Sequence, residues 1–302
     1  MLQSFGKDDS ASKPWQSNEQ MASDSFAAEL ATVDGLKTFP VVAQKALSVL
    51  SNPDFKVSEI SALLKQDPSL GGGVMRMANS AFFAGSKSAT SIEQAFIRLG
   101  RRSIQEVIAA VATMDLFPDS GGIGKRIRDH CAGVAALVQT LAKQFAPKVV
   151  DGIFIGGLLH DVGKMLLIES GEFDYELSDA ILFLPDRIHT EEESLLGYDH
   201  ALLGAAVLSR WRLPEPIPWM VAWHHQPSLA YQHPEIAMSV ALLRIADHID
   251  IFLYEDENAA DKIESLKGNR DLQQAKIPTT KLMSLLDDLK EARDKALTLF
   301  GK

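Results

Sequence analysis

Residues 157–168 read GLLHDVGKMLLI and set three polar side chains into an apolar helical pattern. This pattern predicts a buried helix, because the apolar residues recur at helical spacing, at positions 158, 159, 162, 165 and 166. His160, Asp161 and Lys164 then need partners, since an unpaired ionised carboxylate is costly to bury. A bound cation or a hydrogen-bonded imidazole would supply one. The segment therefore predicts either a metal site at His160 and Asp161 or a pair that satisfies itself.

The composition limits the class of protein. The chain has 302 residues, of which 46% are hydrophobic and 23% charged, as in ordinary globular proteins. This length allows two small domains or one large one. The formal net charge of -10 argues against non-specific binding to nucleic acid or to an anionic membrane surface. We therefore expect proteins or small molecules as partners, with no nucleic acid and no membrane.

Cysteine content and the first residues favour a cytoplasmic setting. The single cysteine, Cys131, excludes an intramolecular disulfide framework and every zinc site built from several thiolates. It is expected to be a small buried apolar residue. Residues 1–15 lack the basic and apolar regions of a secretory signal. No stretch of about 18 residues is apolar enough to span a bilayer.

The chain is predicted to be all-α, with two packed helical subdomains. Residues 1–24 are polar and are expected to form a disordered tail. Helical periodicity fills residues 25–117, and a break rich in Pro, Gly and Ser follows at 118–124. Residues 125–255 form the second subdomain. Residues 256–302 are expected to contain an acidic linker and an amphipathic helix, whose apolar positions run from 282 to 299.

Polar residues mark several helix starts. Capping residues are expected at Asp67 and Asp199 and in two capping-box patterns, Ser91 with Gln94 and Thr190 with Glu193. A helix that starts after Asp67 contains three consecutive glycines at 71–73. Each glycine costs about 1 kcal/mol relative to alanine in a helix. Either close backbone packing offsets that cost or the helix begins later.

Five more residues of metal-ligand type lie in helix-forming stretches, where an exposed polar residue would be the default. They are His130, His200, His224, His225 and Asp247. Any one such histidine would more often be a satisfied core residue. Together with His160 and Asp161 they predict a site for one or two ions of Fe, Mn, Zn or Ni, which imidazole and carboxylate ligands suit. Two ions about 3.5–4 Å apart could polarise a phosphate and activate a bridging water.

Lys164 lies one turn after His160 and projects on a similar face. Its ammonium group could bind a substrate phosphate, so Asp161 and Lys164 are the catalytic candidates if the chain is an enzyme. The alternative is a lysine that reaches solvent or pairs with a carboxylate. Three other histidines have no such context and are expected at the surface or in loops: His189, His233 and His248.

The order of these residues resembles the HD superfamily of metal-dependent phosphohydrolases, in the positions His130, His160, Asp161 and Asp247. With His200, His224 and His225 included, the order of residues is similar to that of the HD-GYP phosphodiesterases, which open cyclic di-GMP. The chain departs from that group after residue 225, where Gln-Pro-Ser follows and the Gly-Tyr-Pro motif is absent.

A closer resemblance is to the HDOD family, the HD-related output domain of bacterial signalling. It covers residues 30–255 and rests on these motifs: LKTFP at 36–40, QDPSL at 66–70, ANSAFF at 78–83, IEQAFIRLG at 92–100, DHALLG at 199–204 and WRLP at 211–214. The resemblance implies a two-part all-helical fold with an HD-like second part. It also implies a regulatory role in signal transduction, often without demonstrated catalysis.

Three functions stay open from the sequence. The first is a bacterial signal-transduction module with a metal-binding HD-like pocket, which acts by recognising signalling proteins or a nucleotide. The alternative is a metal-dependent phosphodiesterase or phosphohydrolase acting on a cyclic dinucleotide or another nucleotide. The third is a nucleotide sensor that binds without turnover.

Overall fold

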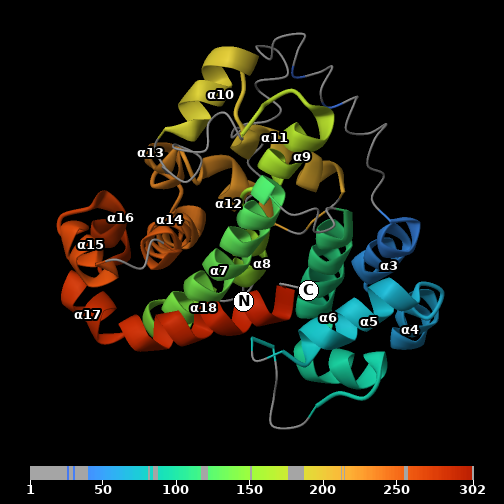
Figure 1. Cartoon of the computed structure of the whole chain (residues 1–302). Helices are drawn as coiled ribbons and strands as arrows, with labels where there is room; N and C mark the ends of the chain where they lie inside the picture. Colours follow the sequence, from blue (N-terminus) through green and yellow to red (C-terminus); the bar gives the residue numbers. More distant parts are fainter. Residues whose placement is uncertain are drawn as a thin grey trace.

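The computed structural model describes Phe26, Leu30 and residues 40–80, 82–83, 88–116, 122–149, 152–175, 187–211, 213, 215–254 and 258–300. Helices are the only regular structure over these residues, which confirms the expected all-α class (Figure 1). The predicted tail at 1–24 lies outside the described residues. In the described part of the chain, every helix is too short or too polar to cross a membrane.

Helices α3 to α6 form one group, coloured blue to blue-green in Figure 1. Their bounds are α3 Val41–Ser51, α4 Val57–Leu64, α5 Pro68–Ala78 and α6 Ile92–Leu116. Each packs against α6, and their inner faces bury aliphatic side chains such as Leu50, Ile60 and Ile108. Burial of such side chains is the main force that holds helices together.

Helix α5 begins at its predicted cap, and two of its glycines pack closely against other helices. The Asp67 side chain accepts a hydrogen bond from the Leu70 N–H at 3.0 Å, so the helix begins where the sequence predicts. A Cβ atom on Gly71 would lie 2.7 Å from the Leu64 carbonyl oxygen, and one on Gly73 would lie 2.5 Å from a Val111 methyl carbon. Close contact with neighbouring helices therefore accounts for Gly71 and Gly73.

Helix α6 is interrupted at Gly100. This residue has φ 79° and ψ 174°, and the helix is kinked there. The predicted cap at the start of α6 is present, since the Ser91 hydroxyl accepts from the Gln94 N–H at 3.2 Å. The Gln94 side chain accepts in return from the Thr90 N–H at 2.8 Å, one residue earlier than in a standard capping box.

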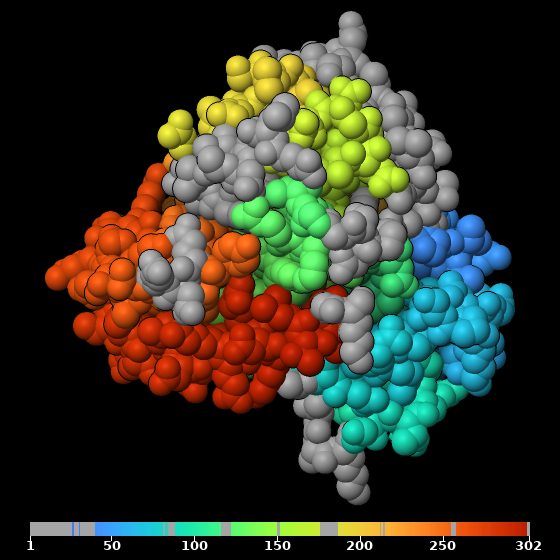
Figure 2. Space-filling model, viewed as in Figure 1, coloured from blue at the N-terminus to red at the C-terminus, as the bar shows by residue number. Residues whose placement is uncertain are grey.

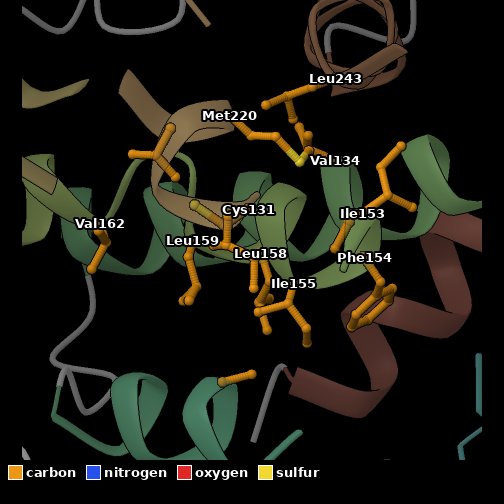
Figure 3. Close-up of a cluster of buried hydrophobic side chains, with 14 of the residues drawn as sticks. Cys131, Val134, Ile153, Phe154, Ile155, Leu158, Leu159, Val162, Met220 and Leu243 are labelled. Carbon is orange, nitrogen blue, oxygen red and sulfur yellow. The ribbon is translucent and has the colours of Figure 1, made fainter. Parts of the chain in front are cut away.

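The central helix of the second group is α7, which packs against α8, α14 and α18 (Figure 1). The bounds of this group are α7 Gly122–Phe145, the 3₁₀ turn η1 Pro147–Val149, α8 Ile153–Leu159, α9 Val162–Ser170, α10 Ile188–Leu196, α11 His200–Arg210, α12 Ile217–Trp223, α13 Pro227–Ala230 and α14 Pro234–Tyr254. Figure 3 shows the apolar core between them, which includes Val134, Leu158, Met220 and Leu243. Cys131 is buried in it, as expected.

Two predicted helix starts in this group have different outcomes. The Asp199 side chain accepts from the Leu202 N–H at 2.7 Å and caps α11, as predicted. The capping box at Thr190 and Glu193 was wrong, because α10 already begins at Ile188 and Thr190 lies inside its first turn.

The C-terminal segment contains four helices, α15 Ala259–Ser265, α16 Arg270–Ala275, α17 Thr279–Ser284 and α18 Leu286–Phe300. The predicted amphipathic helix corresponds to α17 and α18, which are separated at Leu285. Leu289 and Ala296 of α18 are buried, and the helix lies across α7 (Figure 1). It therefore covers the second group of helices.

The two groups meet at a buried carboxylate. Glu106 of α6 accepts from the Gly152 N–H at 3.2 Å, just before α8, and pairs with Arg102 Nε at 3.1 Å. The break at 118–124 is described only from residue 122 onwards, so the division into subdomains there stays a prediction.

Candidate metal centre

His160 and Asp161 lie at a junction between two helices. The sequence predicted one helix through both residues, which was wrong: α8 ends at Leu159 and α9 begins at Val162. Asp161 has φ -101° and ψ 15°, so the chain leaves helical geometry there. The apolar spacing of the sequence continues across this junction, and for that reason the pattern conceals it.

The structure brings all seven predicted ligand residues together, from separate parts of the second helical group. They form two sets, and within each set the ligand atoms all lie within 4.8 Å of one another. One set is Asp161, His200, His224 and His225, and the other is His130, His160 and Asp247. Each of these side chains is buried, with 8% exposure or less.

Asp161 stands between the two sets. Its Oδ1 atom lies 3.1 Å from His200 Nε2 and 3.7 Å from His224 Nε2. Its Oδ2 atom lies 3.5 Å from His160 Nε2 and 3.9 Å from His130 Nε2. One carboxylate oxygen therefore faces each set, which is the arrangement of a carboxylate that can bridge two ions.

Four histidines are held by the outer nitrogen of the ring. His160 Nδ1 lies 2.8 Å from the Gly157 carbonyl oxygen, and His224 Nδ1 lies 2.6 Å from that of Val221. The other two use buried carboxylates: His130 Nδ1 lies 2.9 Å from Asp250 Oδ2, and His200 Nδ1 lies 2.6 Å from Glu192 Oε2. In each ring Nδ1 is engaged and Nε2 is directed to the centre, as in histidines that bind metal.

Some central atoms lie close to other side chains but form no hydrogen bond of good geometry. Among the described residues, Asp161 Oδ1, His224 Nε2 and His225 Nδ1 are buried without a hydrogen bond. Such atoms are costly unless water or an ion satisfies them. His225 Nε2 lies 3.1 Å from His200 Nε2, a separation that suits two nitrogens on one ion at roughly 2.1 Å each. The residues therefore fit a metal ion on chemical and geometric grounds.

The charges of the centre are unevenly distributed. Burial lowers the pKa of His160 to about 4. Burial alone would also lower the pKa of His130, but hydrogen bonds to Asp247 and Asp250 outweigh it and raise that pKa to about 10. For His200, burial is outweighed by Glu192 and Asp161, which raise the pKa to about 9. A histidine binds metal as the neutral imidazole. A bound ion would therefore displace one proton from His130 and one from His200.

Lys164 is buried and does not reach solvent. Its Nζ atom lies 2.7 Å from Asp161 Oδ2. Burial would raise the pKa of Asp161, but His160 and Lys164 outweigh it and hold that pKa well below its usual range. Of the alternatives open from the sequence, pairing with a carboxylate is the one the structure contains.

Two buried acids that support the centre were missed in the sequence. Asp250 follows Asp247 by one turn of α14 and holds His130. A Cβ atom on Gly133 of α7 would lie 1.8 Å from Asp250 Oδ1, so this glycine makes room for the carboxylate. Glu192 accepts from the Tyr175 hydroxyl at 2.5 Å and from the His200 N–H at 2.8 Å. The spacing of 247 and 250 could have indicated the first acid, but no comparable signal marked the second.

The three histidines set aside in the sequence have different environments. His189 lies in α10 and stacks on His225, with ring centroids 4.5 Å apart and an interplanar angle of 9°. The expectation of a surface or loop position was therefore wrong for His189, which adjoins the centre. His233 lies in the turn before α14, as expected, and stacks on Trp223. The expectation was also wrong for His248, which is half-buried on α14 with its Nδ1 2.9 Å from the Arg244 carbonyl oxygen.

Comparison with known proteins gives the family. The HDOD domain matches residues 36–227, which is more than half of the chain. The chain belongs to the HDOD family. This confirms the resemblance found in the sequence. The HDOD match ends before Asp247 and Asp250, which lie in the part of α14 that completes the centre.

Solved structures share this HDOD fold. The crystal structure of a "Putative phosphohydrolase" from Shewanella amazonensis SB2B has a TM-score of 0.69 and 24% identity, covering 91% of this chain and 98% of that chain. An HDOD domain protein of unknown function from Geobacter sulfurreducens has a TM-score of 0.66 and 23% identity, with the same coverage. At these identities the likeness shows the fold.

A curated relative extends beyond the matched region. An uncharacterized protein of Treponema pallidum (strain Nichols) is 26% identical over 222 residues. The alignment covers 72% of this chain but 43% of the relative, so the HDOD chain matches less than half of that protein's length.

Proposed function

We propose that this HDOD protein is a signal-transduction module whose buried HD-like centre binds one or two divalent metal ions, and that it acts by recognising a signalling protein or a nucleotide. The observation that carries the proposal is the shared orientation of His130, His160, His200 and His224, each with Nδ1 held and Nε2 directed to the centre. A core histidine has no need of this common direction. A metal ion requires it.

The two sets of ligand atoms define where ions would bind. His130, His160 and Asp247 would hold one ion, and His200, His224 and His225 would hold the other. Asp161 would contribute one oxygen to each. Nitrogen and oxygen donors suit Fe, Mn, Zn or Ni. A bound ion would supply Lewis acidity toward a phosphate oxygen and would acidify a bound water.

Burial favours a regulatory centre over an open active site. None of the seven proposed ligands is more than 8% exposed, whereas hydrolysis needs a phosphate within reach of the ions. Lys164, the group proposed for phosphate binding, is instead held by Asp161 at 2.7 Å. A bound ion in this setting would stabilise one conformation of the module, as ligands that bind only the folded state do.

A metal-dependent phosphohydrolase is the second candidate, and the complete ligand set favours it. A site with seven ligand groups and a bridging carboxylate has the composition of a two-metal hydrolase. The name of the Shewanella neighbour is consistent with such chemistry in a protein of the same fold.

Metal content tests the first part of the proposal. The protein would be reconstituted without oxygen with Fe, Mn, Zn or Ni, freed of loosely bound ions, and analysed by mass spectrometry. We expect one or two ions per chain, and a loss of at least one ion in Asp161→Ala. Asp129→Ala is the control, because Asp129 pairs with Lys125 on the outer part of α7. A reconstituted wild-type protein without bound metal would contradict the proposal.

Turnover distinguishes the module from the enzyme. The metal-loaded protein would be incubated with cyclic dinucleotides and with a chromogenic phosphodiester, beside Asp161→Ala. If the protein is a signalling module, we expect equal background rates of hydrolysis in the wild type and in Asp161→Ala. Equilibrium dialysis would then measure nucleotide binding without turnover. A rate that depends on Asp161 would establish the hydrolase instead.

A further inference from the structure

Helix α18 is attached to the candidate metal centre through a single buried carboxylate. Asp250 of α14 uses one oxygen on each side: Oδ2 lies 2.9 Å from His130 Nδ1, and Oδ1 lies 2.7 Å from Arg293 Nε. Asp250 is 1% exposed and the Arg293 side chain is 12% exposed. The two contacts fix the carboxylate between a proposed ligand and a C-terminal arginine.

The contact between Asp250 and Arg293 depends on how α7, α14 and α18 pack together. Gly133 of α7 leaves the space that Asp250 occupies, since a Cβ atom there would lie 1.8 Å from Oδ1. Helix α18 packs across α7 (Figure 1), and its Arg293 contacts the Asp250 oxygen that His130 does not use. Figure 2 shows α18, coloured red, along one face of the molecule. The guanidinium group is thus a connection between that face and the centre.

A second contact fixes the far end of α18. The rings of Phe300 and Phe154 have centroids 6.4 Å apart, and Phe154 belongs to α8, the helix that ends just before His160. Figure 3 shows Phe154 at the edge of the apolar cluster. One attachment of α18 therefore leads to α14, which carries Asp247, and the other leads to α8, which ends directly before His160.

We propose that Arg293 is a positioning residue: it orients Asp250, and through it His130, so that the C-terminal helix sets the metal affinity of the centre. This inference rests on the proposed metal site. Groups that orient a metal-bound histidine typically change metal affinity by about 10–100-fold when they are removed. Residue 293 lies well beyond residue 227, where the HDOD match ends. The residue that sets the metal affinity would therefore lie in a part of the chain outside the HDOD match.

Metal affinity of matched variants tests the proposal. Zinc affinity would be measured by competition with a chromophoric chelator for the wild-type chain, Arg293→Met and Arg293→Lys. Arg293→Met keeps the apolar stem but removes the guanidinium group, and we expect an affinity about 10–100-fold weaker. Arg293→Lys keeps a charge and a donor and is expected to recover part of the loss. Lys290→Met, at an exposed position of the same helix, is expected to bind as the wild type does.

Two further measurements separate positioning from general stability. The visible spectrum of the Co²⁺-loaded protein reports the geometry around the ion, and it should change in Arg293→Met but not in Lys290→Met. The double variant Asp250→Asn with Arg293→Met should bind zinc as weakly as Asp250→Asn alone, because Arg293 acts through Asp250. If Arg293→Met does not unfold cooperatively, Arg293→Gln takes its place in every comparison.

The outcomes are distinct from those of the proposed function. If the wild-type chain binds zinc and Arg293→Met binds it equally well, the positioning role is overturned and the metal site stands. Additive losses in the double variant overturn it as well. If the wild-type chain binds no metal after reconstitution, the proposed site itself fails, and the role of Arg293 fails with it.

Discussion

A Cβ atom at position 163 would lie 1.9 Å from the carbonyl oxygen of His200. Gly163 is in the first turn of α9, and His200 is the first residue of α11. The backbones of these two helices therefore meet beside the proposed ligands, with no room for a side chain. This contact holds Asp161 and His200 close together, at 3.1 Å between Oδ1 and Nε2.

Gly163→Ala is expected to destabilise the fold. The obstacle is backbone rather than a movable side chain, so α9 and α11 have to separate, and overpacking of this kind costs about 1–3 kcal/mol. Urea unfolding monitored by circular dichroism would measure the free energy of unfolding. Gly72→Ala is the control, because the nearest atom to its new Cβ is the end of Arg76 at 3.5 Å. It should be neutral or stabilising by up to about 1 kcal/mol. Equal effects of the two substitutions would contradict the packing argument.

Metal binding is expected to release protons at pH 7. The pKa of His130 is raised to about 10 and that of His200 to about 9. Both side chains are therefore imidazolium cations at pH 7 in the metal-free protein. A histidine binds metal as the neutral imidazole, so filling both sets of ligands should release about two protons. Calorimetric titration with zinc in buffers of different ionisation enthalpy gives this number. A heat of binding that is independent of the buffer would refute the expectation.

The same pKa values predict how the metal-free fold responds to pH. A histidine whose pKa is raised on folding adds stability below its unfolded pKa, about 6.5, and that stability is lost as the pH rises through the folded value. The contributions of His130 and His200 should therefore decline between about pH 6.5 and the values near 9 and 10. Apparent metal affinity should rise over this range. Thermal unfolding with and without zinc, measured from pH 6 to 9, would show the two trends in opposite directions.

Glu192→Gln is expected to weaken metal binding about 10–100-fold, because the carboxylate orients His200 from outside the centre. Tyr175→Phe removes only one donor to Glu192 and should have a smaller effect. Chelator competition with zinc measures both. Glu193→Gln changes the exposed neighbour on the same helix and should leave the affinity unchanged. An equal loss in the 192 and 193 variants would argue against the role of Glu192.

Glu106→Ala is expected to destabilise the contact between the two groups of helices. The substitution leaves the Gly152 N–H without its carboxylate acceptor, and a buried unsatisfied group costs about 1–3 kcal/mol. The urea midpoint should fall while the slope of the transition stays the same. Glu59→Ala removes an exposed acid of α4 and serves as the control. Two separate transitions in Glu106→Ala would show instead that the groups unfold independently.

The proposed ligands could be predicted from the sequence because each interrupts an apolar helical pattern. His130 lies on the buried stripe of α7, and His160 and Asp161 stand among leucines and valines. Their order along the chain matched the HD pattern, and the structure brings them together. The ligand roles themselves stay a proposal.

The supporting acids could not be predicted, because their burial depends on other elements. Glu192 is the middle residue of three consecutive glutamates at 191–193, and such a run is typical of a solvated face. It is buried only because His200 and Tyr175 pack against it. Asp250 depends in the same way on Gly133 and Arg293, which are far from it in the sequence.

The helix break at residues 160–161 was also hidden. Apolar residues continue at helical spacing on both sides, so periodicity predicts an unbroken helix. The break lies just before Gly163, where α9 meets α11, and this contact exists only in the tertiary structure.

The position of Arg293 has a consequence for how this protein could be shortened or joined to others. The HDOD match ends at residue 227, but Asp247 lies 20 residues further on, and the arginine that holds Asp250 lies further still. A fragment cut at the limit of the match would keep six of the seven proposed ligand positions and lose the carboxylate of Asp247. By the role proposed for Arg293, a portable unit that keeps this centre has to extend through α18.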